Sequence, residues 1–138
     1  MDGLSSGFRA PLSGMASERR RMQVIAMNIA NANTIRKNGP YVRRSVVFEE
    51  VLGTEASAAP GGVAVSRIVE DTKSEHPRVH NPGHPAADAE GYVRLPNVNI
   101  MAEQVDLLVA RRAYAANLAA YQTYRSMLRE VISQIGGR

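Results

Sequence analysis

Cysteine and tryptophan are absent from this chain of 138 residues, which contains only two phenylalanines and five tyrosines. Without cysteine the chain has neither disulfides nor thiolate metal sites, and both reducing and oxidising compartments stay open. Because bulky aromatic residues are few and alanine supplies much of the apolar share of 44%, a single chain can hardly form a large hydrophobic core by itself. Apolar helical faces then need cover from partner chains, so the composition favours self-association or co-assembly.

Long apolar runs are missing as well. The N-terminal stretch MDGLSSGFRAPLSGM has no continuous apolar region of the kind that secretory signals carry. No other stretch approaches the roughly 20 apolar residues of a membrane span. We therefore expect one soluble structural unit without a cleaved signal.

Recognisable catalytic motifs are also lacking: the chain contains no G-x-S-x-G, H-E-x-x-H or G-x-x-x-x-G-K-[ST] pattern. His76, His80 and His84 lie four residues apart, which on a helix would align three imidazoles and suggest zinc. Pro77 and Pro82 exclude such a helix, so turn and packing roles are favoured. The sequence predicts no enzyme, no metal site and no cofactor.

The positive charge is moderate, with a net charge of +4 and the run Arg19 to Arg21. A basic run allows a nucleic-acid interface. Aromatic residues are not interleaved with these arginines, however, and three consecutive helical side chains spread over about 200°. A solvated or interface-edge face is favoured, and a basic helical nucleic-acid-associated protein stays as the alternative function.

Near the N-terminus, apolar residues recur with helical spacing. One series is seven residues apart and a second fills the positions between: Phe8, Met15, Met22 and Ile29, with Leu12, Arg19 and Ala26. This pattern predicts a helix from about residue 11 to about residue 32, with Pro11 in its first turn and looser chain before it.

The C-terminal third repeats this pattern over a longer stretch. Its two series are Leu107, Tyr114, Tyr121, Leu128 and Ile135, with Arg111, Leu118, Arg125 and Ile132 between. The spacing predicts a coiled-coil-like helix from about residue 97 to 135, capped by Asn97 or Asn99. For the arginines in both series, we expect packed aliphatic stems with solvated heads, or pairing across chains with acidic residues (Glu18, Glu103, Asp106 or Glu130).

Between these helices the pattern changes to short extended segments. YVRRSVVFEEVL and GVAVSRIVED predict the two strands of a hairpin, joined by TEASAAPGG. HPRVHNPGHPAADAEGYVRLPN contains four prolines and predicts an extended, turn-rich segment. The expected fold is mainly α with a small β portion. Long helices in 1–34 and 96–138 pair as a coiled-coil-like layer, joined through 35–95 by the hairpin and the Pro-rich segment in one structural unit.

The motif NIANANT, Asn28 to Thr34, closely resembles the signature of the bacterial flagellar rod and hook axial proteins. GPYVRRSVVFEEVL, GVAVSRIVED and NPGHPAADAEGYVRLPNVNI resemble a proximal-rod member of that family. The resemblance implies a structural subunit of the basal-body drive shaft, exported unfolded through the flagellar type III apparatus and polymerised in the periplasm. Such a subunit transmits torque and helps to form the export channel. By the same resemblance, its partners are further copies, other rod proteins (FlgB, FlgF and FlgG) and the base adaptor FliE.

The asparagines of this motif form the first candidate site. We expect Asn28 and Asn31 to fix the register of a helix-to-ribbon joint, by bonding across subunits or to the descending chain, with Asn117 as a candidate partner. Asn33 is expected to end the helix, and helix termination is the alternative role for all three. The expected subunit interface is formed by the helical series: Met15, Met22, Ile29, Leu107, Tyr114, Leu118, Tyr121, Leu128, Ile132 and Ile135.

Overall fold

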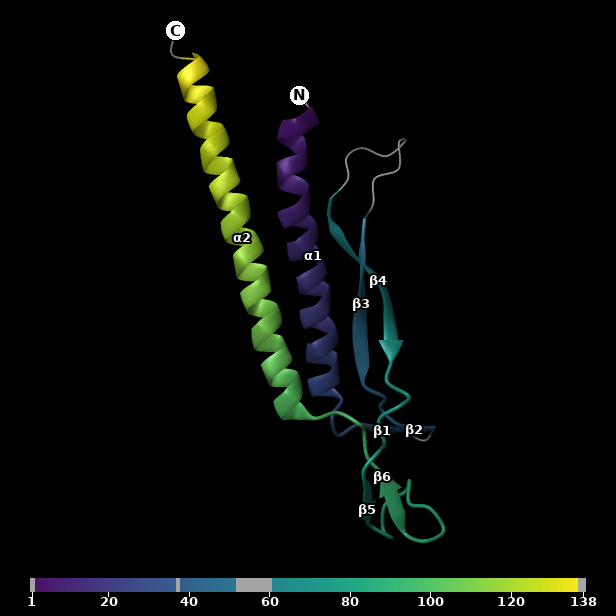
Figure 1. Ribbon diagram of the computed structural model, residues 1–138. Helices are drawn as coiled ribbons and strands as arrows, with labels where there is room; N and C mark the ends of the chain where they lie inside the picture. The colour runs from purple at the N-terminus through teal and green to yellow at the C-terminus, as the bar shows by residue number, and fades with distance from the viewer. Residues whose placement is uncertain (1, 37, 52–60, 137–138) are drawn as a thin grey trace.

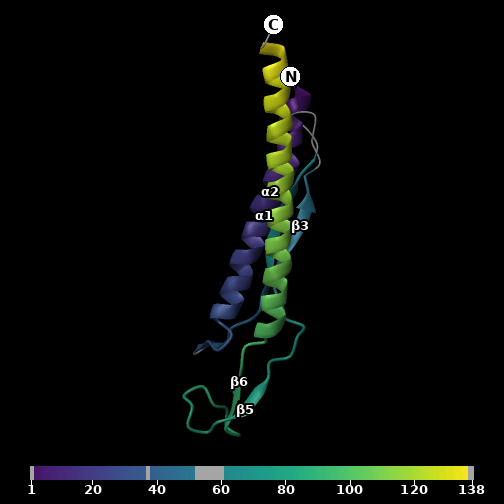
Figure 2. The ribbon, with the colours of Figure 1, turned by 90° about the vertical axis from the view of Figure 1, so that its left-hand side faces the viewer.

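Two long helices dominate the computed structural model, which describes residues 2–36, 38–51 and 61–136. Helix α1 spans Asp2–Ala30 and helix α2 spans Ile100–Gly136. They run antiparallel side by side (Figures 1 and 2). The chain between them forms a ribbon along α1, which comprises residues 41–51 and 61–71, and a lobe beyond the lower ends of the helices, which comprises residues 76–95. The expectation of a mainly helical fold with a small β portion is confirmed.

The β portion consists, within the described residues, of three separate antiparallel strand pairs. The first pair joins β1 (Ile35–Arg36) and β2 (Gly39–Pro40), and it was not expected. The second pair joins β3 (Arg44–Glu50) and β4 (Val63–Glu70), as the hairpin prediction required. The third joins β5 (Arg78–His80) and β6 (Tyr92–Arg94) inside the Pro-rich segment.

Helix α1 begins earlier than its sequence predicted. The expectation of looser chain before Pro11 is wrong, because the helix already starts at Asp2. An internal proline removes one backbone hydrogen bond and costs about 3 kcal/mol. Packing offsets this cost: the Phe8 ring lies 5.3 Å from the Tyr121 ring and 4.6 Å from the Tyr124 ring, between centroids. Tertiary contact with α2 therefore holds the turns that precede the proline.

The N-terminus of helix α2 is capped by Asn99. Its side-chain oxygen accepts a hydrogen bond of 3.2 Å from the backbone N–H of Ala102. Asn97, the other candidate cap, instead connects two loops: its side chain accepts from the N–H of Arg43 and donates to the carbonyl of Asp71, both over 2.8 Å. The two asparagines therefore have different tasks, although only one residue separates them.

The side of α2 that packs on α1 has a four-then-three spacing. Its buried and half-buried members at this spacing are Glu103, Leu107, Ala110, Tyr114, Asn117, Tyr121, Tyr124 and Leu128. The first predicted series lies on this side as far as Leu128, but the second is wrong in phase. Arg111, Leu118 and Arg125 are exposed, one residue after Ala110, Asn117 and Tyr124. Ala110 and Asn117 occupy inner positions where the two helices approach closely, as the short distance between Gly14 and Asn117 shows.

The β3–β4 hairpin lies along α1, on the side away from α2 (Figure 1). Two serines of α1 attach it: Ser17 donates to the carbonyl of Val63 over 2.8 Å, and the hydroxyl of Ser13 accepts from the N–H of Val63 over 3.1 Å. The register shifts between Val47 and Phe48. Most of the predicted connection TEASAAPGG, namely residues 54–60 of 54–62, lies outside the described residues.

We predict that Gly14→Leu destabilises the chain. A Cβ atom at Gly14 would lie only 2.7 Å from Nδ2 of Asn117, so a larger side chain must push the helices apart. Overpacking of this kind costs about 1 to 3 kcal/mol, whereas Ala16→Leu on the exposed side of the same helix should change stability by less than about 0.5 kcal/mol. Urea unfolding followed by circular dichroism measures both; equal midpoints would show that the interface adapts freely.

Candidate functional site

Asn28, on the last turn of α1, is completely buried and makes four hydrogen bonds. Its amide nitrogen donates to the carbonyl of Arg44 over 2.7 Å and to Oε2 of Glu103 over 2.9 Å. Its amide oxygen accepts from the hydroxyl of Tyr41 over 2.9 Å and from the N–H of Arg44 over 3.0 Å. One side chain thereby connects the end of α1, the start of the ribbon and the start of α2.

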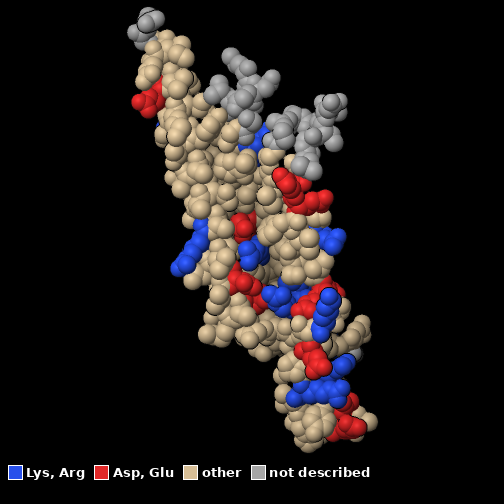
Figure 3. All heavy atoms as spheres, viewed as in Figure 1, with Lys and Arg blue, Asp and Glu red and all other residues tan. Residues whose placement is uncertain are grey.

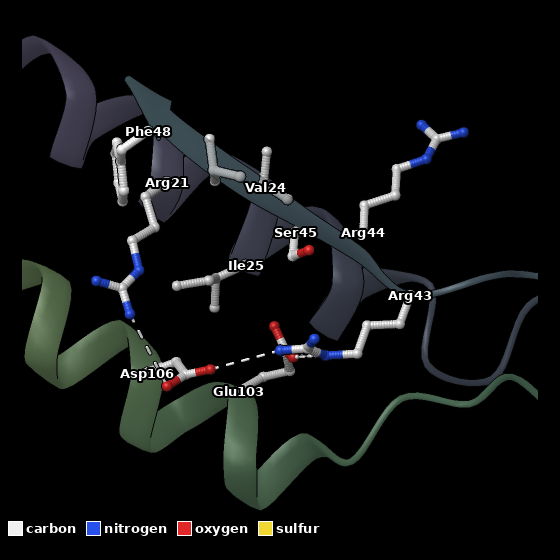
Figure 4. Close-up of a pocket in the computed structure, with 10 residues that line it drawn as sticks. Arg21, Val24, Ile25, Arg43, Arg44, Ser45, Phe48, Glu103 and Asp106 are labelled. Carbon is white, nitrogen blue, oxygen red and sulfur yellow. Dashed lines mark hydrogen bonds and ion pairs between the residues drawn. The ribbon is translucent and has the colours of Figure 1, made fainter. Parts of the chain in front are cut away.

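We call this meeting point of α1, the ribbon and α2 the joint. Glu103 is, after Asn28, the second residue on which the joint depends, and it too is completely buried. A buried carboxylate is costly unless it is paired and hydrogen-bonded. Here Nε of Arg43 donates to Oε1 of Glu103 over 2.6 Å, while Asn28 donates to the other oxygen. Both oxygens are therefore satisfied, and the charge is neutralised by an arginine from the ribbon (Figure 4).

A weaker chain of ion pairs extends the joint toward solvent. Arg43 also reaches Asp106 at 3.5 Å, and Arg21 of α1 reaches the other oxygen of Asp106 at 4.0 Å. Figure 4 shows these side chains around a cavity of about 240 Å³ between α1, α2 and β3. Because Asp106 is partly exposed, these outer pairs contribute little stability compared with the buried pair.

Tyr41 closes the other side of the joint. Its hydroxyl donates to Asn28, and the guanidinium of Arg44 lies 5.8 Å from the centre of its ring. Burial raises the pKa of Tyr41 above 10.0; Arg44 lowers it and Glu103 raises it further. The phenol is therefore held neutral, as its role as a hydrogen-bond donor requires.

The other asparagines of the candidate site have more local roles. Asn31, the first residue after α1, donates over 2.8 Å to the carbonyl of Met27 in the last turn of that helix, and Asn33 is exposed in the turn that contains both asparagines. Asn117 donates over 3.1 Å to Ala113 in α2 and lies opposite Gly14, far along the helix pair from Asn28. Within one chain Asn117 therefore does not meet the asparagines of the motif, and a contact with them across subunits stays a prediction.

Sequence reasoning missed two members of the joint, Tyr41 and Arg43, and it named Glu103 only as a possible partner, across chains, for the arginines of the helical series, whereas its partners here are Arg43 and Asn28. One signal for Glu103 was available: it lies seven residues before Ala110 and fourteen before Asn117, in phase with the inner side of α2. No comparable signal exists for Tyr41 or Arg43, because their place depends on how the ribbon folds back on the helices.

The predicted interface residues are divided between inner and outer positions. Seven of them are half-buried: Met15, Met22, Ile29, Leu107, Tyr114, Tyr121 and Leu128. Leu118, Ile132 and Ile135 are exposed. The first set is therefore already partly covered within the chain, whereas the second is available to a neighbour.

The three histidines contact separate groups in the lobe. A ring nitrogen of His76 lies 2.7 Å from the carbonyl of Leu95, and His84 accepts from the N–H of Ala86 over 3.1 Å. His80 lies against Tyr92, with 5.0 Å between ring centroids. In the part of the chain that the structure describes, no three potential ligands gather in a metal-binding cluster.

Two segments of the chain match models of known protein families. Residues 8–36 match the family model described as flagella basal body rod protein, and residues 89–135 match that of the flagellar basal body rod FlgEFG protein C-terminal. The two segments contain the end of α1 and the start of α2, which meet at the joint. None of the described helices combines the length and apolar character that a membrane-spanning segment needs.

Several curated relatives cover nearly the whole chain. The flagellar basal-body rod protein FlgC of Salmonella typhimurium is 36% identical over 123 residues, which is 88% of this chain and 90% of the relative. FlgC of Borreliella burgdorferi is 34% identical over 152 residues, covering 98% and 99%. FlgC of Bacillus subtilis is 38% identical over 136 residues, covering 87% and 90%.

Fold and matches together define a structural, non-enzymatic subunit of the bacterial flagellar basal-body rod. Within that class, the chain belongs to the family of the flagellar basal-body rod protein FlgC. The alternative of a nucleic-acid-associated protein receives no support from these relatives.

Replacement of Asn28 by alanine should destabilise the chain by about 3 kcal/mol, because Glu103, Tyr41 and the Arg44 backbone all lose a buried partner. The matched control is Asn31→Ala, which removes one bond at the end of the same helix and should cost less than about 1 kcal/mol. Urea unfolding of both variants gives the comparison. Similar losses would mean that Asn28 contributes no more than a helix-end asparagine.

Alkaline pH should weaken the joint through Tyr41. Because its pKa is raised in the folded chain, the unfolded chain ionises first. The stability that depends on the neutral phenol is thus complete below pH 10.0 and is lost as the pH rises toward the folded pKa. Unfolding free energies at neutral pH and above pH 10.0 should differ less for Tyr41→Phe than for the wild type; an unchanged difference would contradict this assignment.

Proposed function

We propose that this rod subunit belongs to the proximal part of the drive shaft, and that it polymerises there in the periplasm with its own copies and with other axial proteins. The observation that carries this proposal is the distribution of apolar side chains. In the described residues the buried apolar core is small: Val24, Ile25, Ala32, Tyr41, Val93 and Ala110. Helix α2 alone exposes ten large apolar side chains, which a solitary chain has little reason to keep.

The antiparallel helix pair is suited to an inner layer of the shaft. The four-then-three spacing of α2 favours coiled-coil-like packing on α1. The ribbon and the lobe lie outside this pair, on the side of α1 away from α2 and beyond the ends of the helices (Figure 1). We infer that the helices of neighbouring subunits surround the export channel, and that the ribbon and lobe make outer contacts.

The Asn28 joint acts in this proposal as a register device. A shaft that transmits torque needs subunits whose segments keep a constant angle to one another. Glu103 and Asn28 can be satisfied only in one arrangement of α1, α2 and ribbon, because any slip leaves a buried charge or amide unpaired. The joint therefore specifies geometry, and a rigid ribbon can pass torsional load to the helices.

The partners and the route of delivery follow from the family resemblance. We propose contacts with further copies, with FlgB, FlgF and FlgG, and with the base adaptor FliE, after export without a cleaved signal. The exposed members of the predicted interface, Leu118, Ile132 and Ile135, are the candidate contact residues on α2.

The assembly proposal predicts a specific failure for Leu118→Asp. Since Leu118 is exposed, the isolated chain should keep its stability within about 0.5 kcal/mol. A carboxylate buried without a partner in a subunit interface costs several kcal/mol, so the amount of chain retained in basal bodies should fall more than tenfold. Quantitative mass spectrometry of detergent-purified basal bodies, stripped of hook and filament, measures retention.

The control is Gln122→Asp, which places the same charge four residues further along the exposed side of α2. Retention of Leu118→Asp at the wild-type level would show that this side of α2 faces solvent in the rod. Absence of the wild-type chain from basal bodies that contain the other rod proteins would contradict the proposed function itself.

A further inference from the structure

A further cavity of about 560 Å³ lies beside α1, between this helix and the β3–β4 hairpin. Glu18 reaches it from α1, Phe48 and Glu50 from β3, and Asn117 from α2. Among the described residues that line it, two are acidic and none is lysine or arginine. We call it the acidic cavity, and its charge asks for a partner of the opposite sign.

Glu18 is the residue of this cavity whose needs the chain does not meet. Its side chain is only 15% exposed, and its Oε2 atom has no access to solvent and accepts no hydrogen bond within the described residues. The guanidinium that pairs with this oxygen, that of Arg21, lies 3.7 Å away, which is beyond hydrogen-bonding distance. Burying a carboxylate oxygen without a donor is costly, so such an orphaned atom requires an explanation. Glu103, by contrast, has both oxygens satisfied.

The chain places no other cation to complete this site. Arg19 and Arg20, which follow Glu18 on α1, are exposed, and Arg20 donates to Gln23. Residues 52–60 lie outside the described part of the chain, but their sequence LGTEASAAP contains neither lysine nor arginine. On the face that Figure 3 shows, acidic side chains lie at the upper end of the hairpin, and the upper half of α2 is almost free of charged ones. The acidic cavity is therefore left for a cation from outside the chain.

The groups around the cavity suit arginine better than lysine or a metal ion. A guanidinium is planar, offers five donors to several acceptors at once and stacks on aromatic rings, whereas an ammonium is a compact, strongly hydrated charge. The carboxylates of Glu18 and Glu50 are acceptors, and the ring of Phe48 is 38% exposed. Asn117 uses its amide nitrogen to donate to Ala113, so its oxygen can accept as well. A metal ion lacks the third charged ligand, since no such cluster occurs in the described residues.

We propose that the acidic cavity receives an arginine side chain of a neighbouring rod subunit, whose guanidinium pairs with Glu18 and, at the rim, with Glu50. This inference rests on the proposed assembly and adds to it one contact of defined chemistry. Once the contact has formed, removal of either partner leaves the other charge buried and unpaired, which weakens binding strongly. In the free chain Glu18 has no such partner. Stability of the free chain and retention in the rod should therefore respond differently to its removal.

Glu18→Gln tests this difference, because it keeps the shape of the side chain and removes its charge. The urea midpoint of the isolated chain should not fall, since Oε2 has no hydrogen bond to lose. The amount of chain retained in purified basal bodies should fall more than about tenfold, as for a buried ion pair that loses one partner. Quantitative mass spectrometry of the basal bodies measures retention.

Two neighbouring glutamates of β3 provide a matched pair of variants. Glu50→Gln changes an exposed residue at the rim of the cavity, so it should lower retention without affecting folding. Glu49→Gln makes the same change one residue earlier, where the side chain points to the other face of the strand. Its retention should equal that of the wild type.

A cross-link can identify the arginine. With p-benzoyl-L-phenylalanine in place of Phe48, irradiation of basal bodies should join the chain to an arginine-containing peptide of another subunit, which mass spectrometry then identifies. Replacing that arginine by glutamine should lower retention as Glu18→Gln does. The two changes together should retain at least as much chain as either alone, because no charge is then left unpaired.

Four results would overturn the inference: wild-type retention of Glu18→Gln, equal retention of Glu49→Gln and Glu50→Gln, a cross-linked peptide without arginine, or additive losses in the double variant. If Glu18→Gln lowers the urea midpoint, the comparison of Glu50→Gln with Glu49→Gln decides, because both residues are exposed. Absence of the wild-type chain from basal bodies is a different outcome, since it contradicts the proposed function itself.

Discussion

The structure depends on one buried charge. Glu103 has no access to solvent, and its carboxylate is stable there only because Arg43 and Asn28 approach its two oxygens together. These partners come from the ribbon and from α1, while the glutamate belongs to α2. The positions of all three elements are therefore interdependent, and the joint forms only when each element is in place.

Above this joint the two helices approach each other closely. Gly14 lies against Asn117, and the aromatic contact of Phe8 with Tyr121 and Tyr124 holds the first turns of α1. Small residues in the middle let the helices approach, and bulky rings at the far end fill the space where they diverge. Polar contacts of Asn28 and Glu103 therefore hold the helix pair at one end, and the aromatic contacts of Phe8 hold it at the other. Most of its remaining apolar surface faces outward.

This division explains which expectations were correct. The hairpin was predictable because β-branched residues cluster on both sides of a turn-forming connection, and helix existence was predictable from the seven-residue series. The phase of the second series was wrong, because Leu118 and Ile132 are more apolar than Ala110 and Asn117 and were taken as the inner positions. Hydrophobicity alone does not distinguish a side chain covered by its own fold from one that a neighbour must cover. Helix α1 starts before Pro11 for a similar reason, since contact with α2 is invisible in a local pattern.

The sequence by itself determined the class of fold, the strong helical periodicity, the hairpin and, through NIANANT and the Pro-rich motif, the resemblance to flagellar axial proteins. These properties depend on neighbouring residues, and their signals are local. Only the tertiary structure decided that Asn28 meets Glu103 across 75 positions of chain, that Asn31 bonds to the last turn of α1, and that apolar side chains stay exposed at both ends of α2. Those facts depend on how distant segments are brought together, because the free energy of burying a charge or an amide is decided by partners that are remote in sequence.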